Sequence, residues 1–123
     1  MKKSLRDTFR KIELEQGEAS EKYFHDALQN AKDSGRLPPW LRGWSHSEKW
    51  SPTDRAGIDF IIWTDRGRIK VNVKSSYSLA KQFERQHRGE GIVAVVVNIL
   101  ERPEVFLGKL ISTIGDLRKD MPA

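Results

Sequence analysis

Residues 58–74 read IDFIIWTDRGRIKVNVK, and this stretch decides the fold. Its first part is mostly β-branched or aromatic, DRG at 65–67 can turn the chain, and residues 68–74 alternate strictly between polar and apolar. Two such runs joined by a short glycine-containing loop predict a β-hairpin. The alternation places two sets of side chains on opposite faces of the second strand. One set is Ile69, Val71 and Val73, and the other is Lys70, Asn72 and Lys74.

The segments around the hairpin predict further helices and strands. Residues 5–33 carry apolar side chains at helical spacing, with Gly17 as a point where the helix can break. The other expected elements are a strand within 41–50, a helix from 75 to about 89, a strand at 91–99, a short edge strand at 105–107 and a helix at 109–119. The continuous apolar run at 91–99 predicts a central strand covered on both faces. This order predicts an α/β fold, in which helices flank a mixed central sheet and one extra helix ends the chain.

Length and composition exclude several classes of protein. The 123 residues suit one domain, which we expect to span residues 1–123. The absence of cysteine excludes a disulfide scaffold, a thiolate zinc site, an iron–sulfur cluster and a cysteine nucleophile. Charged residues interrupt the N-terminal region, and the longest apolar run is too short to span a bilayer. We therefore expect a cytoplasmic protein with no signal peptide and no membrane contact.

The net charge of +5 is unevenly distributed along the chain. Residues 1–12 form a basic arm with five basic residues and one acidic residue, and residues 65–88 hold seven basic residues against two acidic ones. An acidic segment lies between them, at 13–26. Such runs are either solvated faces or the footprint of a polyanionic partner.

Asp59 is a carboxylate inside an apolar strand, where an unpaired charge would be costly. Its candidate partners are Lys74, Asn72 and a bound cation. The alternative is that backbone N–H groups at the start of the strand donate hydrogen bonds to it.

Residues 54–60 (DRAGIDF) and 69–76 (IKVNVKSS) resemble the PD-(D/E)XK nuclease superfamily, which includes restriction endonucleases and Holliday-junction resolvases. The family pattern is an Asp entering one strand and an acidic-x-Lys triplet on the next. Asp59 matches the first part, residues 72–74 stand in place of the triplet, and Glu21 matches the Glu that the first helix often supplies. The resemblance spans residues 14–100 and implies a restriction-endonuclease-like α-β-β-β-α-β core.

The resemblance also implies an activity, a cofactor and a site. The activity is hydrolysis of DNA (rather than RNA) phosphodiester bonds in repair or recombination, with Mg²⁺ or Mn²⁺, which prefer oxygen ligands. Asp59 is the implied principal ligand, with the Val73 carbonyl and Asn72 as further ligands. Lys74 is implied to position the attacking water and stabilise charge, and Glu21 to hold a metal-bound water. So small a nuclease implies structure-selective or partner-directed cleavage, and a homodimer if both strands are cut.

Asn72 departs from the family pattern because an amide carries no negative charge. Two outcomes remain open. Either another carboxylate (Glu21, Asp54 or Asp65) substitutes for it, or the domain is catalytically inactive and binds nucleic acid or a protein partner.

Other side chains are candidate contacts for nucleic acid. A basic stripe at helical spacing, together with the hairpin lysine and the serine that precedes the helix, suits phosphate binding. These residues are Lys70, Ser76, Lys81, Arg85 and Arg88. The tryptophans before the motif can either stack on unpaired bases or close a small core under a long loop. They are Trp40, Trp44 and Trp50.

Overall fold

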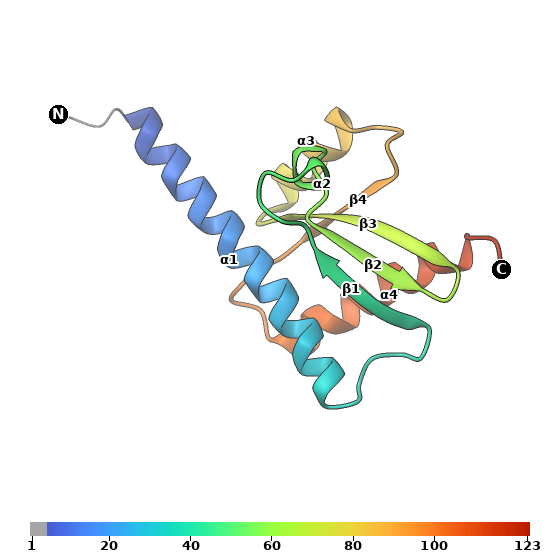
Figure 1. Ribbon diagram of the computed structural model, residues 1–123. Helices are drawn as coiled ribbons and strands as arrows, with labels where there is room; N and C mark the ends of the chain where they lie inside the picture. The colour runs from blue at the N-terminus through green and yellow to red at the C-terminus, as the bar shows by residue number, and fades with distance from the viewer. Residues whose placement is uncertain (1–4) are drawn as a thin grey trace.

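The computed structural model describes residues 5–123, and it describes side chains from Gly17 onward. The side chains of the predicted basic arm at 1–12 lie outside this description. The elements are α1 (Leu5–Asp33), β1 (Leu41–His46), α2 (Pro52–Arg55), β2 (Phe60–Thr64), β3 (Gly67–Lys74), α3 (Tyr77–Gln86), β4 (Ile92–Val96) and α4 (Pro103–Lys119) (Figure 1). None of the described helices combines the length and apolar character needed to cross a membrane.

The four strands form one mixed sheet in the order β1-β2-β3-β4. The first three strands are antiparallel neighbours, and β4 lies parallel to β3 after the crossover through α3. The predicted hairpin is confirmed, with Phe60 opposite Val71 and Thr64 opposite Gly67. The mixed α/β class predicted from the order of elements is also confirmed.

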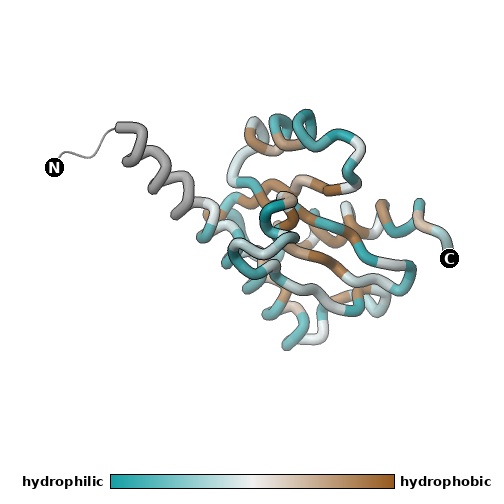
Figure 2. Tube along the Cα trace, turned by 45° about the horizontal axis from the view of Figure 1, so that its top comes forward, coloured by the Kyte–Doolittle hydropathy of each residue, from teal (hydrophilic) through white to brown (hydrophobic). Residues whose placement is uncertain are grey.

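One face of the sheet packs against α1 and α4, which also contact each other (Figure 1). Apolar side chains that alternate along the strands supply the sheet's half of this core, and the most hydrophobic stretches of the trace run along the strands (Figure 2). The largest fully buried side chains are Phe24, Leu28, Phe60, Ile62, Val71, Val97, Leu110 and Ile114. The opposite face carries α3, because the Lys74 ammonium on that face lies 5.3 Å from the Phe83 ring.

The first helix runs without interruption from Leu5 to Asp33, so Gly17 does not break it. Nothing lies within 4 Å of the position that a Cβ at Gly17 would take. The helix ends where predicted, since Gly35 adopts a left-handed φ of 69° and the Arg36 N–H donates to the Ala31 carbonyl.

Two predictions about the second half of the chain are wrong, and one short helix in the first half has no counterpart among the predicted elements. Residues 105–107 lie in α4 rather than in an edge strand, because Pro103 occupies the first turn and starts that helix six residues before the predicted 109. The predicted central strand is β4 at the edge of the described sheet, and Val96 in it is exposed. The short helix α2 was not predicted, although Ser51 caps it and Pro52 opens it.

Candidate functional site

Asp59 immediately precedes β2 and is fixed by backbone hydrogen bonds to the segments on both sides of it. Its N–H donates to the Val71 carbonyl at 2.8 Å, and its carbonyl accepts from the Ser47 N–H at 2.9 Å. The side chain adds a third link, because Oδ2 accepts a hydrogen bond of 2.7 Å from the Val73 N–H. Of the protein groups considered as partners from the sequence, a backbone N–H is the one that donates a hydrogen bond to the carboxylate.

Burial raises the pKa of Asp59 from 3.8 to about 6. The hydrogen bond from Val73 and the positive charge of Lys74 lower this pKa, whereas the negative charges of Glu21 and Asp54 raise it further. These charges act on Asp59 because they lie near it. The fold thus brings Asp59 and Lys74 into one electrostatic neighbourhood with Glu21 and Asp54, two of the carboxylates considered as substitutes for the charge that Asn72 lacks.

Asn72 is buried, with 4% of its surface exposed. Its Nδ2 donates to the Gly57 carbonyl at 2.8 Å, which fixes the orientation of the amide. Its Oδ1 is buried and accepts no hydrogen bond from any described residue. An acceptor buried in this way carries a desolvation cost, so it marks a place where a donor or a cation would be favourable.

Gly57 makes this arrangement sterically feasible. Its φ of 86° favours glycine, and a Cβ at this position would lie 2.9 Å from Cε2 of Phe83. The same Phe83 ring lies under the Lys74 ammonium and against the ring of His87, with 4.1 Å between the two ring centroids. Helix α3 therefore supports both the loop that holds Asn72 and the lysine beside it.

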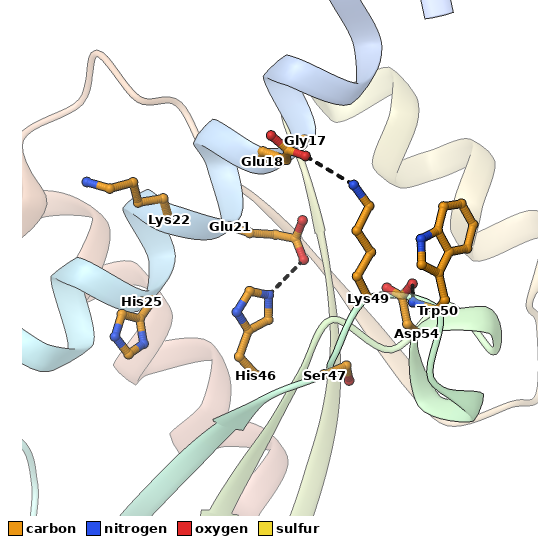
Figure 3. A pocket seen from close by; sticks show the side chains of 10 residues that line it. All are labelled: Gly17, Glu18, Glu21, Lys22, His25, His46, Ser47, Lys49, Trp50 and Asp54. Atoms are coloured by element: carbon orange, nitrogen blue, oxygen red, sulfur yellow. Dashed lines mark hydrogen bonds and ion pairs between the residues drawn. The ribbon is translucent and has the colours of Figure 1, made fainter. Parts of the chain in front are cut away.

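Glu21 reaches from α1 toward the end of β1, where its Oε1 lies 3.1 Å from Nε2 of His46 (Figure 3). The His46 ring stacks on the buried Phe60, with 4.4 Å between the ring centroids and 9° between the planes. His46 thus positions the carboxylate that the sequence indicates. No sequence pattern indicates this role for His46, which follows from its place opposite Phe60 in the sheet.

A cavity of about 780 Å³ opens between α1 and the segment that joins β1 to α2 (Figure 3). It is lined by Gly17, Glu18, Glu21, Lys22, His25, His46, Ser47, Lys49, Trp50 and Asp54. Two of these residues, Glu21 and Asp54, are the carboxylates whose charge acts on Asp59. The cavity therefore adjoins the Asp59 neighbourhood.

The candidate nucleic-acid contacts are only partly brought together. Ser76 caps α3 by accepting a hydrogen bond from the Leu79 N–H. Lys81 and Arg85 lie on α3, and Lys81 forms an ion pair with Glu84 at 3.6 Å. The remaining two candidates lie outside the helix. Lys70 lies within β3, and Arg88 follows the end of α3 at Gln86, so the predicted stripe of three on one helix is wrong.

The implied metal ligands fit a hard cation in part. Among the side chains described from residue 17 onward, no three His, Cys, Asp or Glu residues form a group that could hold a metal ion. The oxygen donors present are the carboxylate of Asp59, the unpaired Oδ1 of Asn72 and the carbonyl of Val73. Oxygen atoms of this kind are the ligands that Mg²⁺ and Mn²⁺ prefer, although they supply only one charge.

No family model, curated protein or solved structure matches this chain. The residues and contacts described above are therefore the basis for any functional conclusion.

Proposed function

We propose that the chain is a nuclease that hydrolyses DNA phosphodiester bonds with Mg²⁺ or Mn²⁺ and that its architecture is restriction-endonuclease-like. The observation that carries the proposal is the unpaired, buried Oδ1 of Asn72 on the strand that Asp59 contacts through Val73. The antiparallel hairpin followed by a parallel crossover through α3 supports the architecture.

In this proposal Asp59, Asn72 and the Val73 carbonyl hold the cation, which when bound supplies Lewis-acid activation of water and phosphate. A carboxylate with a pKa of about 6 is ionised at the pH of the cytoplasm and has lost part of its hydration, so a cation would compensate its charge. Lys74, on the same face as Asn72, provides a positive charge for the phosphate as negative charge develops on it. Glu21, oriented by His46, accepts hydrogen bonds from water that enters the site.

The proposal is tested by incubating plasmid, branched and single-stranded DNA with the protein, with and without Mn²⁺. We expect Mn²⁺-dependent cleavage that Asp59→Asn and Lys74→Ala each reduce by at least about 100-fold. Asp65→Asn is the matched control, because Asp65 lies at the other end of β2, in an ion pair with Arg118. Equal cleavage by the wild type and all variants would indicate a contaminant and refute the proposal.

A second candidate function is a catalytically inactive domain of the same fold that binds nucleic acid or a protein. The observation that favours it is the hydrogen bond that already occupies Oδ2 of Asp59. In that case, calorimetry would show no heat on addition of Mn²⁺, and a salt-dependent gel shift would occur without cleavage. The homodimer that cutting both strands requires belongs to the first proposal, and a monomeric mass by light scattering at high concentration would contradict it.

A further inference from the structure

Trp50 differs from the other two tryptophans that precede the motif. Trp40 and Trp44 pack against the hydrophobic core, which confirms the core interpretation for those two. Trp50 is 68% exposed and lies at the edge of the cavity described above. A large aromatic ring left in water at the mouth of a cavity is a feature of binding surfaces rather than of core packing.

The local backbone holds Trp50 in this position. In the part of the chain that the structure describes, it is the only residue other than glycine with a positive φ, at 68°. Its N–H donates to Oδ2 of Asp54 at 2.9 Å, and the next residue, Ser51, caps α2. A strained bulky residue persists only where its surroundings determine it, and such strain concentrates at functional sites. The indole ring is thus presented before any ligand arrives.

The chemistry of the cavity selects the kind of ligand that the ring would stack on. Its three carboxylates outnumber its two lysines, and one lysine, Lys49, is paired with Glu18 at 3.3 Å. A phosphate group would be repelled inside, whereas a neutral base would not. Carboxylates also accept hydrogen bonds from the amino groups on base edges. The volume of about 780 Å³ lies within the range of small-ligand sites.

The cavity lies next to Asp59, where the proposed reaction would take place. Glu21 and Asp54 line the cavity and also lie near Asp59. Figure 3 shows Trp50 and Lys49 extending from the same segment, between β1 and α2, with Lys49 directed toward Glu18 on α1. A nucleotide on Trp50 would therefore be close to a phosphodiester placed at Asp59.

We infer that Trp50 is a stacking platform for an unpaired nucleobase, so that the substrate is single-stranded or branched DNA rather than continuous duplex. This inference rests on the proposed nuclease function and narrows its substrate class. In a continuous duplex every base is stacked on its neighbours, so no base face is free to meet the indole. An unpaired base offers a face for stacking and an edge for the cavity's carboxylates.

The test measures binding of fluorescein-labelled single-stranded, Y-shaped and duplex DNA by anisotropy, in EDTA. We expect Trp50→Ala to weaken binding of the first two about 5- to 150-fold and to change duplex binding by less than about twofold. Trp50→Tyr should retain most of the affinity because it keeps an aromatic face. Trp63→Ala is the matched control, since Trp63 is 43% exposed on the sheet face opposite α1. Thermal unfolding of each variant confirms that it is folded.

Failure of this inference differs from failure of the proposed function. Equal losses on single-stranded and duplex DNA, no loss in Trp50→Ala, or an equal loss in Trp63→Ala would overturn the stacking role. If cleavage depends on Asp59 and Trp50→Ala cleaves single strands as well as the wild type does, the stacking role is overturned and the nuclease proposal is supported. Selective loss of single-strand binding without cleavage of any DNA would overturn the nuclease and support the stacking role.

Discussion

Replacing Asp59 by Asn should stabilise the protein at neutral pH when no divalent cation is present. The pKa of Asp59 is about 6 in the folded protein, against 3.8 for an unperturbed Asp. Between these values the folded state binds more protons than the unfolded state, so the free energy of unfolding falls as the pH rises from about 4 to 6. Above pH 6 the cost of the ionised carboxylate is constant. An amide at this position carries no charge, so it does not have this desolvation cost at any pH.

The size of the effect follows from the difference between the two pKa values. A difference of about 2 units, at about 1.4 kcal/mol per unit, gives an upper figure of about 3 kcal/mol in the free energy of unfolding. Asn can keep the hydrogen bond from the Val73 N–H through its own Oδ1, so the gain is not offset by an unpaired backbone donor. We expect Asp59→Asn to exceed the wild type by about 2–3 kcal/mol at pH 8 and to match it near pH 4.

The assay is urea unfolding of both proteins in EDTA at several values of pH between 4 and 8. Asp65→Asn is a control with the opposite sign. The hydrogen bond from Arg118 lowers the pKa of Asp65, so its carboxylate stabilises the folded state at neutral pH and loses that effect only below about pH 3.8. Asp65→Asn should therefore be less stable than the wild type at pH 8.

Parallel stability profiles for the wild type and Asp59→Asn would refute this reasoning. So would a loss of stability at pH 8 in Asp59→Asn, because it would mean that the ionised carboxylate contributes favourably to the folded state. A gain confirms that the protein retains a residue that costs it stability, as functional residues often do.

Three further substitutions probe the surroundings of the site. Gly57→Ala should lower the free energy of unfolding in urea by about 1–3 kcal/mol, because the φ of Gly57 is positive and a Cβ there would meet the Phe83 ring. Gly43→Ala should lower it less, because the space around Gly43 is open. Asn72→Asp should lower the melting temperature in EDTA, since the buried donor to the Gly57 carbonyl is lost. Adding Mn²⁺ should raise the melting temperature of this variant more than that of the wild type. Replacing Lys81 and Arg85 together by Ala should reduce the slope of log Kd for DNA against log salt by about 2, and an unchanged slope would exclude both as phosphate contacts.

The elements that could be predicted from the sequence are those with a local signal. The hairpin at 58–74 shows its alternation and its turn within one short segment, and the helix at 5–33 ends at a glycine that adopts the expected left-handed conformation. The strand predicted within 91–99 is confirmed as β4 at Ile92–Val96, whereas its predicted central position in the sheet is wrong. An apolar run indicates burial without showing what buries it, and β4 lies at the edge of the described sheet.

The candidate site was predictable to the extent that sequence neighbours determine it. Period-two alternation places Asn72 and Lys74 on one face, and the structure agrees. That Asn72 is buried depends on α3 and on the loop at Gly57, which no pattern within the strand reveals. The pairing of Glu21 with His46 links residues 25 positions apart in the sequence, so it exists only after β1 packs beside α1.

Asn72 reduces the negative charge of the proposed metal site, but it also avoids a second buried carboxylate there. A carboxylate at this position would lose the donor to the Gly57 carbonyl and would place a second buried negative charge near Asp59. Since Asp59 alone already has its pKa raised to about 6, two such groups would share a proton rather than both ionise. The amide avoids this conflict, and its bond to Gly57 leaves Oδ1 oriented without a partner. In the proposed metal site, the residue that reduces the charge available to a cation would thus also be the one that presents an oriented, unpaired oxygen before the cation binds.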